Sequence, residues 1–294
     1  RKGMKAFSVV NHLKLQAVPK KFDAARIIAP DTTLGGFLSK GLGKYFRKQL
    51  ESRTHIKLDT QQDLHKELAY AGSVDGINAT IDESKASDSY VWEHILELVP
   101  ESWHSILKTV SISNVELPDG RVIPIKSYML MGSGHTFPLQ TILFYCICKA
   151  VLELMGSKAK VNVFGDDIIF PSQYAHYVIG SLENLGFTVN MNKSFIDGPF
   201  RESCGGDYHS GVDVRPFMPE NSCQKLTKNE YTELIHKLIN GFYKRWSYEE
   251  LKETFDLLFL ELLLLHGNIC VVPDFEPVTA GVHFCPRWLR FMRK

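Results

Sequence analysis

The stretch Val161-Asn-Val-Phe-Gly-Asp-Asp-Ile-Ile-Phe170 sets two adjacent carboxylates, Asp166 and Asp167, on a tight turn between apolar segments. Two short apolar segments joined by such a turn predict a β-hairpin. Neighbouring like charges repel each other and lose hydration beside buried strands, so we expect a cation to compensate them. Mg²⁺ or Mn²⁺ suits these hard oxygen ligands, and a pair of such ions is a common device for phosphoryl transfer. An ordinary exposed turn explains Gly165-Asp-Asp167 equally well, because Gly-Asp pairs are common in turns.

The composition is typical of a globular chain, since 44% of the 294 residues are hydrophobic. The length suits one large domain or roughly two to three small ones. The most apolar run, Leu257 to Leu265, is interrupted by Glu261 and is too short to span a membrane, so we expect a buried helix there. The chain opens with Arg1-Lys-Gly-Met4 and shows no targeting segment. Because the first Met is not the first residue, we expect a piece of a longer protein.

Cysteine, histidine and charge patterns exclude several kinds of site. The six cysteines show no Cys-x-x-Cys spacing and the eleven histidines include no His-Glu-x-x-His, so we expect no zinc site or disulfide framework, and a reducing cytosolic setting. The net charge of +1 favours no class of partner. Basic residues nevertheless gather at both ends, where they suit contact with phosphates or form an ordinary solvated surface. They are Arg1, Lys2, Lys5, Lys14, Lys20, Lys21 and Arg26, and Arg287, Arg290, Arg293 and Lys294.

The hydrophobic pattern predicts helices mixed with short antiparallel strands, which indicates an α+β architecture without repeats or flexible linkers. A hairpin is expected around Pro118-Asp-Gly120, because glycine tolerates a positive φ. Met131-Gly-Ser-Gly134 predicts a flexible loop that enters a long apolar helix, with Pro138 in its first turn. We expect helices at 34–50, 60–71 (capped by Asp59 or Thr60), 86–99 (ended by Pro100), 138–154, 173–185, 227–243 and 248–266, further strands at 77–81, 110–117, 121–126 and 187–190, and irregular structure at 198–211.

A second acidic cluster follows the strand at 77–81, in Ala79-Thr-Ile-Asp-Glu-Ser-Lys-Ala-Ser-Asp-Ser89. Asp82 ends that strand, so it would converge with Asp166 if the strand pairs beside the Asp-Asp hairpin. Asp88 opens the next helix, where a carboxylate is either an ordinary cap or a substrate contact. The residues therefore favour Asp82 as a metal ligand and leave both roles of Asp88 open.

Four features, in this order along the chain, resemble the palm of viral RNA-dependent RNA polymerases: a basic segment, an acid at a strand end, a glycine-rich loop entering an apolar helix, and a Gly-Asp-Asp hairpin. The closer resemblance is to replicases of the single-stranded RNA bacteriophages, the Q-beta type of the levivirus family, over roughly residues 15 to 220. Val18-Pro-Lys20 with Arg26 is similar to the basic finger strand of that family. The other matching strings are the acidic cluster quoted above, Met131-Gly-Ser-Gly-His-Thr-Phe137, Phe164-Gly-Asp-Asp-Ile-Ile169, Gly198-Pro-Phe-Arg-Glu-Ser-Cys-Gly205 and Ser210-Gly-Val-Asp-Val214.

The resemblance implies a right-hand polymerase fold: a palm with an antiparallel sheet flanked by helices, partial fingers and a helical thumb segment. It assigns residues 1–76 to the fingers segment with the basic strand, 77–220 to the palm with the catalytic motifs, and 221–294 to the thumb segment. Known members are considerably longer. We therefore expect parts to be missing at one or both ends.

The resemblance also implies roles for individual residues. Asp82 and Asp166 would hold two Mg²⁺ ions, with Mn²⁺ as an alternative, and Asp167 would complete the site. Lys193 matches a lysine proposed as general acid toward pyrophosphate, although a surface lysine is the simpler explanation. Asp88 would bind the ribose 2′-hydroxyl and so select ribonucleotides. Further nucleotide contacts would be Lys20, Lys21, Arg26, Gly132, Ser133, Thr136 and Gln140, and primer or template contacts would be Arg201, Glu202, Ser203, Cys204 and Gly205.

Five positions depart from the family pattern. Glu83 stands where an apolar residue is usual, Ser133 where Asn is expected, and His135 in an aromatic position. Pro138 and Gln140 stand where acids are common. None of these positions is a metal ligand. They concern mainly the nucleotide-selecting loop and indicate a distant family member.

We therefore expect an RNA-directed RNA polymerase, a nucleotidyltransferase that copies a phage RNA genome in the cytoplasm of an infected bacterium. A reverse transcriptase is one alternative, and Asp88 argues against it, because enzymes that use deoxynucleotides typically place bulk there. A non-catalytic RNA-binding remnant is the other. The expected partners are RNA template and product, ribonucleoside triphosphates and, by resemblance alone, host translation elongation factors, but no membrane.

Overall fold

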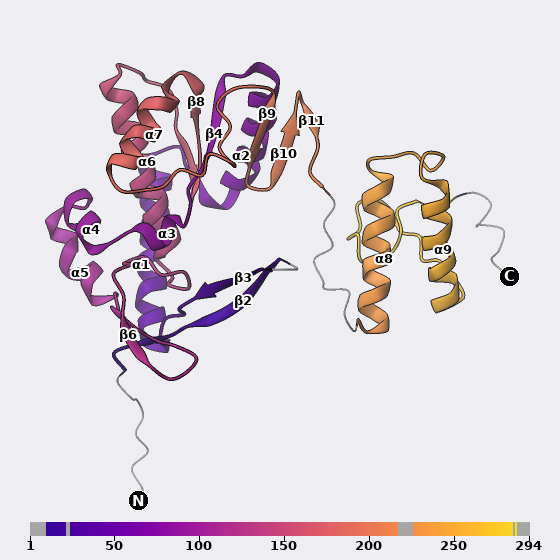
Figure 1. The fold of residues 1–294 in the computed structure, drawn as a ribbon, viewed down its shortest axis with the longest axis horizontal. Coiled ribbons are helices and arrows are strands. Elements are labelled where there is room, and N and C mark those ends of the chain that lie inside the picture. Colours follow the sequence, from indigo (N-terminus) through magenta and orange to yellow (C-terminus); the bar gives the residue numbers. More distant parts are fainter. Residues whose placement is uncertain (1–9, 22–23, 217–225, 285, 287–294) are drawn as a thin grey trace, which may run out of the picture. The chain divides into compact units, whose positions relative to one another are not determined.

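The computed structural model describes residues 10–21, 24–216, 226–284 and 286, without the side chains of Lys21 and Ala24 (Figure 1). The chain divides into two units. Unit 1 comprises residues 1–18 and 25–215, and unit 2 comprises residues 19–24 and 216–294. Each unit buries an apolar core of its own.

An antiparallel three-stranded sheet forms the centre of unit 1. Its strands lie in the order β4 (Asn78–Asp82), β8 (Asp167–Pro171) and β7 (Asn162–Phe164). The middle residues of β4 and β8 are buried, because the sheet is covered on both faces. In the register of the pair, Asp82 lies directly opposite Asp167. The expected pairing of the acidic strand end with the Asp-Asp hairpin is thus confirmed.

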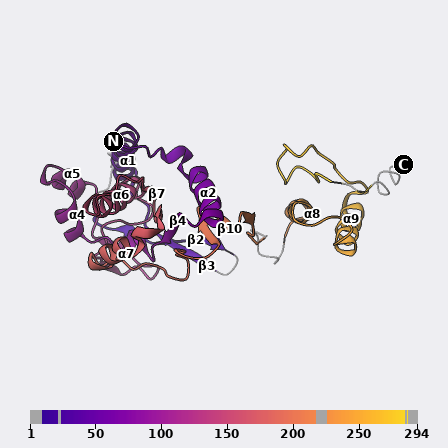
Figure 2. The ribbon, with the colours of Figure 1, turned by 90° about the horizontal axis from the view of Figure 1, so that it is seen from above.

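Three helices cover the two faces of this sheet, and a fourth packs along one of them. Figures 1 and 2 show α6 (Thr136–Leu154) and α7 (Ala175–Asn184) on one side and α2 (Leu58–Asp75) on the other, while α1 (Thr33–Arg53) packs along α6. By length and composition alone, α6 could cross a membrane, which the sequence analysis did not foresee. However, 56% of its apolar window is buried within the protein. We therefore interpret α6 as the core helix of unit 1.

A second antiparallel sheet packs against α2. It consists of β9 (Phe200–Ser203), β10 (Gly206–His209) and β11 (Val212–Asp213). The expectation of irregular structure at 198–211 was therefore wrong. The tight turns between these strands place Cys204, Gly205, Ser210 and Gly211 at positive φ. Such turn residues interrupt the alternating pattern by which strands are recognised.

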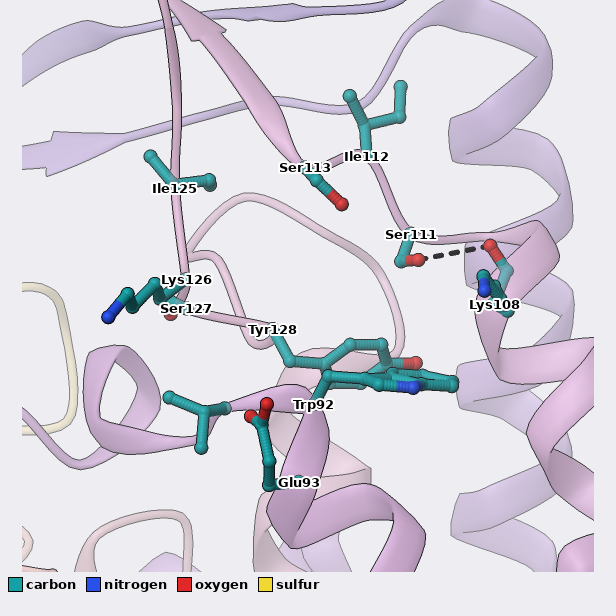
Figure 3. Close-up of a pocket in the computed structure, with 11 residues that line it drawn as sticks. Trp92, Glu93, Lys108, Ser111, Ile112, Ser113, Ile125, Lys126, Ser127 and Tyr128 are labelled. Atoms are coloured by element: carbon teal, nitrogen blue, oxygen red, sulfur yellow. Dashed lines mark hydrogen bonds between the residues drawn. The ribbon is translucent and has the colours of Figure 1, made fainter.

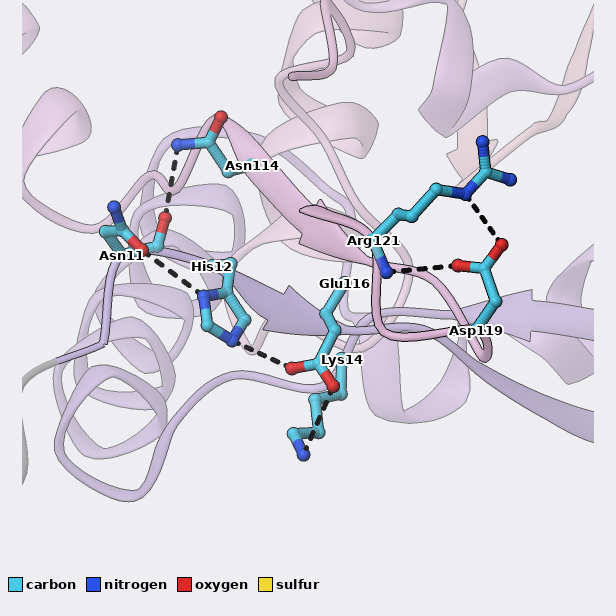
Figure 4. Close-up of polar contacts among 7 residues, drawn as sticks. All are labelled: Asn11, His12, Lys14, Asn114, Glu116, Asp119 and Arg121. Atoms are coloured by element: carbon cyan, nitrogen blue, oxygen red, sulfur yellow. Dashed lines mark hydrogen bonds and ion pairs between the residues drawn. The ribbon is translucent and has the colours of Figure 1, made fainter. Parts of the chain in front are cut away.

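A third sheet joins a strand near the start of the described chain to a hairpin about a hundred residues later in the sequence. β1 (Leu13–Lys14) pairs in parallel with β5 (Asn114–Glu116), and β5 pairs with β6 (Val122–Pro124). In Figure 4, Glu116 accepts from His12 Nε2 at 2.9 Å and lies 3.5 Å from Lys14 Nζ, so it links β5 to β1. Arg121 Nε donates to Asp119 Oδ2 at 2.7 Å in the hairpin turn.

Short elements fill the interval between β4 and β5. They are α3 (Ala86–Ser89), α4 (Trp92–Leu98), the 3₁₀ helix η1 (Glu101–Trp103) and α5 (His104–Thr109); a further 3₁₀ helix, η2 (Ser172–Tyr174), precedes α7. The single helix expected at 86–99 was wrong, because Tyr90 is extended and Val91 forms a bridge with Ser127. The strand expected at 187–190 is reduced to one bridge, between Val189 and Glu83.

The remaining elements agree with the sequence pattern except at their ends. β2 (Gln16–Lys21) and β3 (Ala24–Ile28) pair with each other. In unit 2, Thr227 and Glu230 form a capping box at the start of α8 (Lys228–Tyr243), and α9 (Lys252–His266) begins later than expected. α2 begins after Lys57, and neither Asp59 nor Thr60 is its cap.

Candidate active site

The Gly165-Asp166-Asp167 turn joins β7 to β8, and its glycine is required. Gly165 has a φ of +68°, and a Cβ there would lie 2.4 Å from Cε2 of Phe137. Its N–H donates to Thr141 Oγ1 at 3.1 Å. Two residues of α6, Phe137 and Thr141, therefore fix the position of the turn. Asp166 is exposed at the tip, and Asp167 begins β8.

Asp82 lies beside this turn and is held by the segment 190–194. Its Oδ2 accepts from Asn190 Nδ2 at 3.0 Å and lies 4.0 Å from Lys193 Nζ. Its backbone N–H donates to Ser194 Oγ at 3.1 Å. Lys193 was expected at the site from the sequence, whereas Asn190 and Ser194 were not, although all three lie in one polar run. Their contact with Asp82 depends on chain packing that no local pattern encodes.

The surroundings of Asp167 disfavour the ionised form of its carboxyl group. Burial, followed by the neighbouring charge of Asp166, raises the pKa of Asp167 to about 7. Cys204 Sγ donates to Asp167 Oδ2 at 3.3 Å and so joins the β9–β10 turn to the hairpin. A divalent cation would relieve this repulsion, and the carboxylate oxygens suit Mg²⁺ or Mn²⁺. Within the described ranges, no three Asp, Glu, His or Cys side chains form a metal-binding group, and Mg²⁺ commonly binds through one or two carboxylates together with waters and substrate phosphates.

Glu83, directly after Asp82, is a buried carboxyl group. Glu83 is 3% exposed, and none of the residues that the structure describes forms a hydrogen bond with either carboxyl oxygen. Burial, then the charges of Asp82, Glu183 and Asp166, raise the pKa of Glu83 to about 8. At pH 7 Glu83 is therefore largely protonated and neutral, at a position where the resemblance predicts an apolar residue.

The glycine-rich loop before α6 is anchored by α1 and the segment before it, which the sequence analysis missed. The N–H of Gly134 lies 3.3 Å from Asp31 Oδ2 and 3.2 Å from Ser39 Oγ, both of which accept from it. Ser39 also donates to Asp31. A Cβ at Gly43 would lie 2.2 Å from the carbonyl oxygen of Gly134, so glycine allows the close approach of α1.

The nucleotide contacts expected in this loop differ in their exposure. Gly132 is exposed, with a φ of +111°, and the partly exposed Ser133 hydroxyl lies 2.9 Å from His135 Nδ1. By contrast, Thr136 and Gln140 are only 6% and 5% exposed. The Thr136 hydroxyl donates to a backbone carbonyl of the loop. A ligand can therefore reach Gly132 and Ser133 directly, whereas Thr136 and Gln140 belong to the packed base of the loop.

Arg201 is fully buried and clamps the segment before β9. Its Nε donates to the carbonyl of Asn78 at 2.6 Å, and its Nη atoms donate to the carbonyls of residues 196, 197, 198 and 200. The next residues differ: Glu202 is half-buried, and the buried Ser203 hydroxyl lies 3.0 Å from His65 Nδ1. Of the five expected primer contacts, Arg201 and Ser203 therefore have internal partners, and the turn at Cys204 is partly exposed.

The other expected nucleotide contacts lie on three elements. Asp88 is on α3, and partial burial raises its pKa. Lys20, on β2, and Arg26, on β3, are both exposed. The side chain of Lys21 lies outside the described residues. Contact of these basic residues with a triphosphate stays a prediction.

Comparison with known proteins identifies relatives of the whole site region. Residues 2–248 match the family described as RNA replicase, beta-chain. The chain is 39% identical over 212 residues to the RNA-directed RNA polymerase beta chain of Escherichia phage MS2, which covers 71% of this chain and 38% of the relative. It is 37% identical over 205 residues to the RNA-directed RNA polymerase subunit beta of Qbeta virus (strain MX1), covering 69% and 35%. The chain thus spans well under half the length of these curated relatives.

Solved structures share the fold at low sequence identity. The RNA-dependent RNA polymerase of a human picorbirnavirus gives a TM-score of 0.52 at 15% identity, covering 90% of this chain and 59% of that one. Telomerase from Candida albicans also gives 0.52, at 12% identity, covering 87% and 54%. The fold alone therefore does not distinguish these two kinds of protein. The sequence match does, and the chain belongs to the RNA replicase beta-chain family.

Proposed function

We propose that this chain is the catalytic part of an RNA-dependent RNA polymerase, which joins ribonucleotides in the 5′ to 3′ direction and copies a single-stranded RNA phage genome. The observation that carries the proposal is the register of β4 and β8, which sets Asp82 opposite Asp167 and beside the exposed Asp166. Membership in the replicase family supports it. Within this proposal, residues 1–76 are fingers, 77–220 the palm and 221–294 a thumb segment.

Two Mg²⁺ ions, or Mn²⁺, would be held by Asp82, Asp166 and Asp167. When bound, such ions lower the pKa of the primer 3′-hydroxyl and neutralise the triphosphate. The protein's own contribution is positioning: Asn190 orients the Asp82 carboxylate, and Cys204 orients Asp167.

Proton transfer and nucleotide selection fall to groups around the carboxylates. Lys193, whose Nζ lies 4.0 Å from Asp82 Oδ2, would donate a proton toward the leaving pyrophosphate. Asp88, Gly132 and Ser133 would contact the incoming ribonucleotide, with Thr136 and Gln140 shaping the loop beneath it. Basic side chains would steer the triphosphate: Lys20, Lys21 and Arg26.

The β9–β10 turn is proposed to hold the primer terminus. Cys204 and Gly205 would touch the primer, with Glu202 beside them, while Arg201 and Ser203 keep the turn in place through their internal hydrogen bonds. The partners would be RNA template and product, ribonucleoside triphosphates and host translation elongation factors, in the cytoplasm of an infected bacterium. No membrane partner is proposed.

Primer extension on an RNA template tests the proposal. With Mg²⁺ present, we expect incorporation from ribonucleoside triphosphates and little from deoxynucleoside triphosphates, because a polar site for the 2′-hydroxyl rejects the analogue that lacks it. A preference for deoxynucleotides would instead identify a reverse transcriptase, an alternative that the structural likeness to telomerase makes worth testing. RNA binding without incorporation of either would identify a non-catalytic remnant.

A further inference from the structure

His135, directly before α6, is a buried histidine with one polar contact. The residue is 2% exposed, and its Nδ1 lies 2.9 Å from Ser133 Oγ, so the ring and the hydroxyl share a hydrogen bond. Its Nε2 is shielded from solvent, and none of the described residues forms a hydrogen bond with it. Tyr128, which lines the pocket shown in Figure 3, meets the His135 ring edge to face, with ring centroids 6.0 Å apart. Within the described part of the chain, Ser133 is therefore the hydrogen-bond partner of this ring.

The hydrogen bond between His135 and Ser133 has a favoured direction. Burial lowers the pKa of His135 to about 4, although the charge of Asp31 acts in the opposite sense. The ring is therefore neutral at pH 7 and carries a single N–H. Buried N–H groups without a partner are rare in folded proteins, and unpaired acceptors are less so. The N–H therefore belongs on Nδ1, where Ser133 Oγ accepts it, and Nε2 is the bare nitrogen.

The backbone on both sides of the Ser133 side chain is already held in place. The Ser133 N–H donates to the carbonyl of Leu130 at 3.3 Å, and α1 with the segment before it holds the N–H of Gly134. The remaining freedom is rotation of the Ser133 side chain, which is partly exposed. Accepting from His135 fixes the Ser133 oxygen and leaves the hydroxyl hydrogen for a partner outside the chain. The loop thereby presents one oriented donor.

We propose that His135 is a positioning residue whose Nδ1–H holds the Ser133 hydroxyl, so that this hydroxyl donates to an acceptor oxygen of the incoming nucleotide. The inference rests on the proposed nucleotide contact of Ser133 and deepens it, because it adds the residue that orients the contact and the direction of the hydrogen bond. A hydroxyl that is oriented in advance costs less to order when the ligand binds. With the opposite tautomer, Ser133 would donate to Nδ1 and could only accept from the nucleotide.

The tautomer of His135 can be measured on the full chain without a ligand. Nitrogen-15 NMR of protein labelled at histidine reports which ring nitrogen carries the proton, and the His135 signals are assigned by their loss in His135→Asn. At pH 7 we expect the proton on Nδ1. A proton on Nε2, or a charged ring, would overturn the proposal. This measurement needs no polymerase activity, so its failure and the failure of the proposed function are distinguishable.

Equilibrium binding of ATP with Mg²⁺ tests the effect of His135 on the nucleotide. His135→Phe keeps an aromatic ring beside Tyr128 but removes the N–H, so we expect it to weaken binding about threefold to tenfold. His135→Asn keeps an N–H donor close to the position of Nδ1 and should bind nearly as tightly as the wild type. The control is His176→Phe, at an exposed histidine of α7, which should bind as the wild type does.

Ser133→Ala, alone and combined with His135→Phe, shows whether the two residues act together. Because His135 acts through Ser133, the double variant should bind no more weakly than Ser133→Ala alone. Losses that multiply, full affinity in His135→Phe, or no ATP binding by the wild type would overturn the proposal. So would equal losses in His135→Asn and His135→Phe, the result expected of a purely structural role. ATP binding that depends on His135 without primer extension would support this proposal and contradict the polymerase activity.

Discussion

Lys193 and Asp82 face each other at the end of β4, with 4.0 Å between Nζ and Oδ2. If Lys193 donates a proton to pyrophosphate, Lys193→Leu should lower kcat by about a hundredfold and leave KM for the nucleotide nearly unchanged. Steady-state kinetics across pH measures this effect. Lys193→Arg is the matched variant, because it keeps the charge beside Asp82 but donates a proton poorly. An unchanged kcat in Lys193→Leu would show that Lys193 is an ordinary surface lysine and not a proton donor.

Glu83 makes stability depend on pH in a direction unusual for an acid. Its pKa of about 8 lies above the ordinary 4.5, so the folded chain keeps a proton that the unfolded chain loses. Its contribution to stability is therefore lost as pH rises from about 4.5 to 8. In EDTA, Glu83→Leu should raise the free energy of unfolding by about 1–3 kcal/mol, and more at pH 8 than at pH 5.

Urea unfolding at several pH values measures this gain. Glu83→Gln serves as the control, because it removes the titration but keeps a buried polar group that has no hydrogen-bond partner among the described residues. The two variants should therefore share the same flattened pH dependence, and only Glu83→Leu should be more stable at pH 5. If both retained the pH dependence of the wild type, Glu83 would not be the group that titrates.

At the scale of elements, the catalytic hairpin depends on how closely α6 approaches it. A Cβ at Gly165 would collide with the Phe137 ring and would sit at a positive φ, so Gly165→Ala should cost about 2–4 kcal/mol and reduce activity. Gly156→Ala is a matched control: Gly156 has a φ of +73°, but no atom of the described residues lies within 4 Å of its Cβ position. It should cost only about 1 kcal/mol, from backbone strain alone. Equal losses of unfolding free energy in the two variants would contradict the close contact.

Elements with strong local patterns were predictable from the sequence. α1 and α6 carry apolar residues at helical spacing, and the hairpin of β7 and β8 is marked by its glycine turn, so their existence was confirmed with small errors at the ends. Elements shaped by distant contacts were not predictable. The helix expected at 86–99 is interrupted at Val91, which forms a bridge with Ser127. Ser127 follows α5 in the sequence, so no local pattern around Val91 indicates this contact.

The same distinction applies to the candidate site. The carboxylates were located from short strings, because a strand end and a turn are local features. Asn190 and Ser194 were missed, as were Asp31 and Ser39, since each acts on a residue far away in sequence. Arg201 was expected at the primer, whereas its buried side chain donates to backbone carbonyls. A local motif indicates that a residue matters but not which partner it meets.

At the scale of the whole molecule, unit 1 contains all three carboxylates and the segments that position them. The chain covers 38% of the MS2 relative and 35% of the Qbeta relative, so the activity of this chain itself is the quantity to measure. Two-metal catalysis by Asp82, Asp166 and Asp167 is the central claim about it.

Single-nucleotide extension of a primer on an RNA template, with ribonucleotides and Mg²⁺, tests that claim most directly. The comparison is between wild type, Asp166→Asn and the control Asp63→Asn, an exposed acid on α2 whose carboxylate lies 3.5 Å from Lys66 Nζ. We expect the control to extend at the wild-type rate and Asp166→Asn to be slower by about a hundredfold to a thousandfold. Extension by Asp166→Asn at the wild-type rate would contradict the claim.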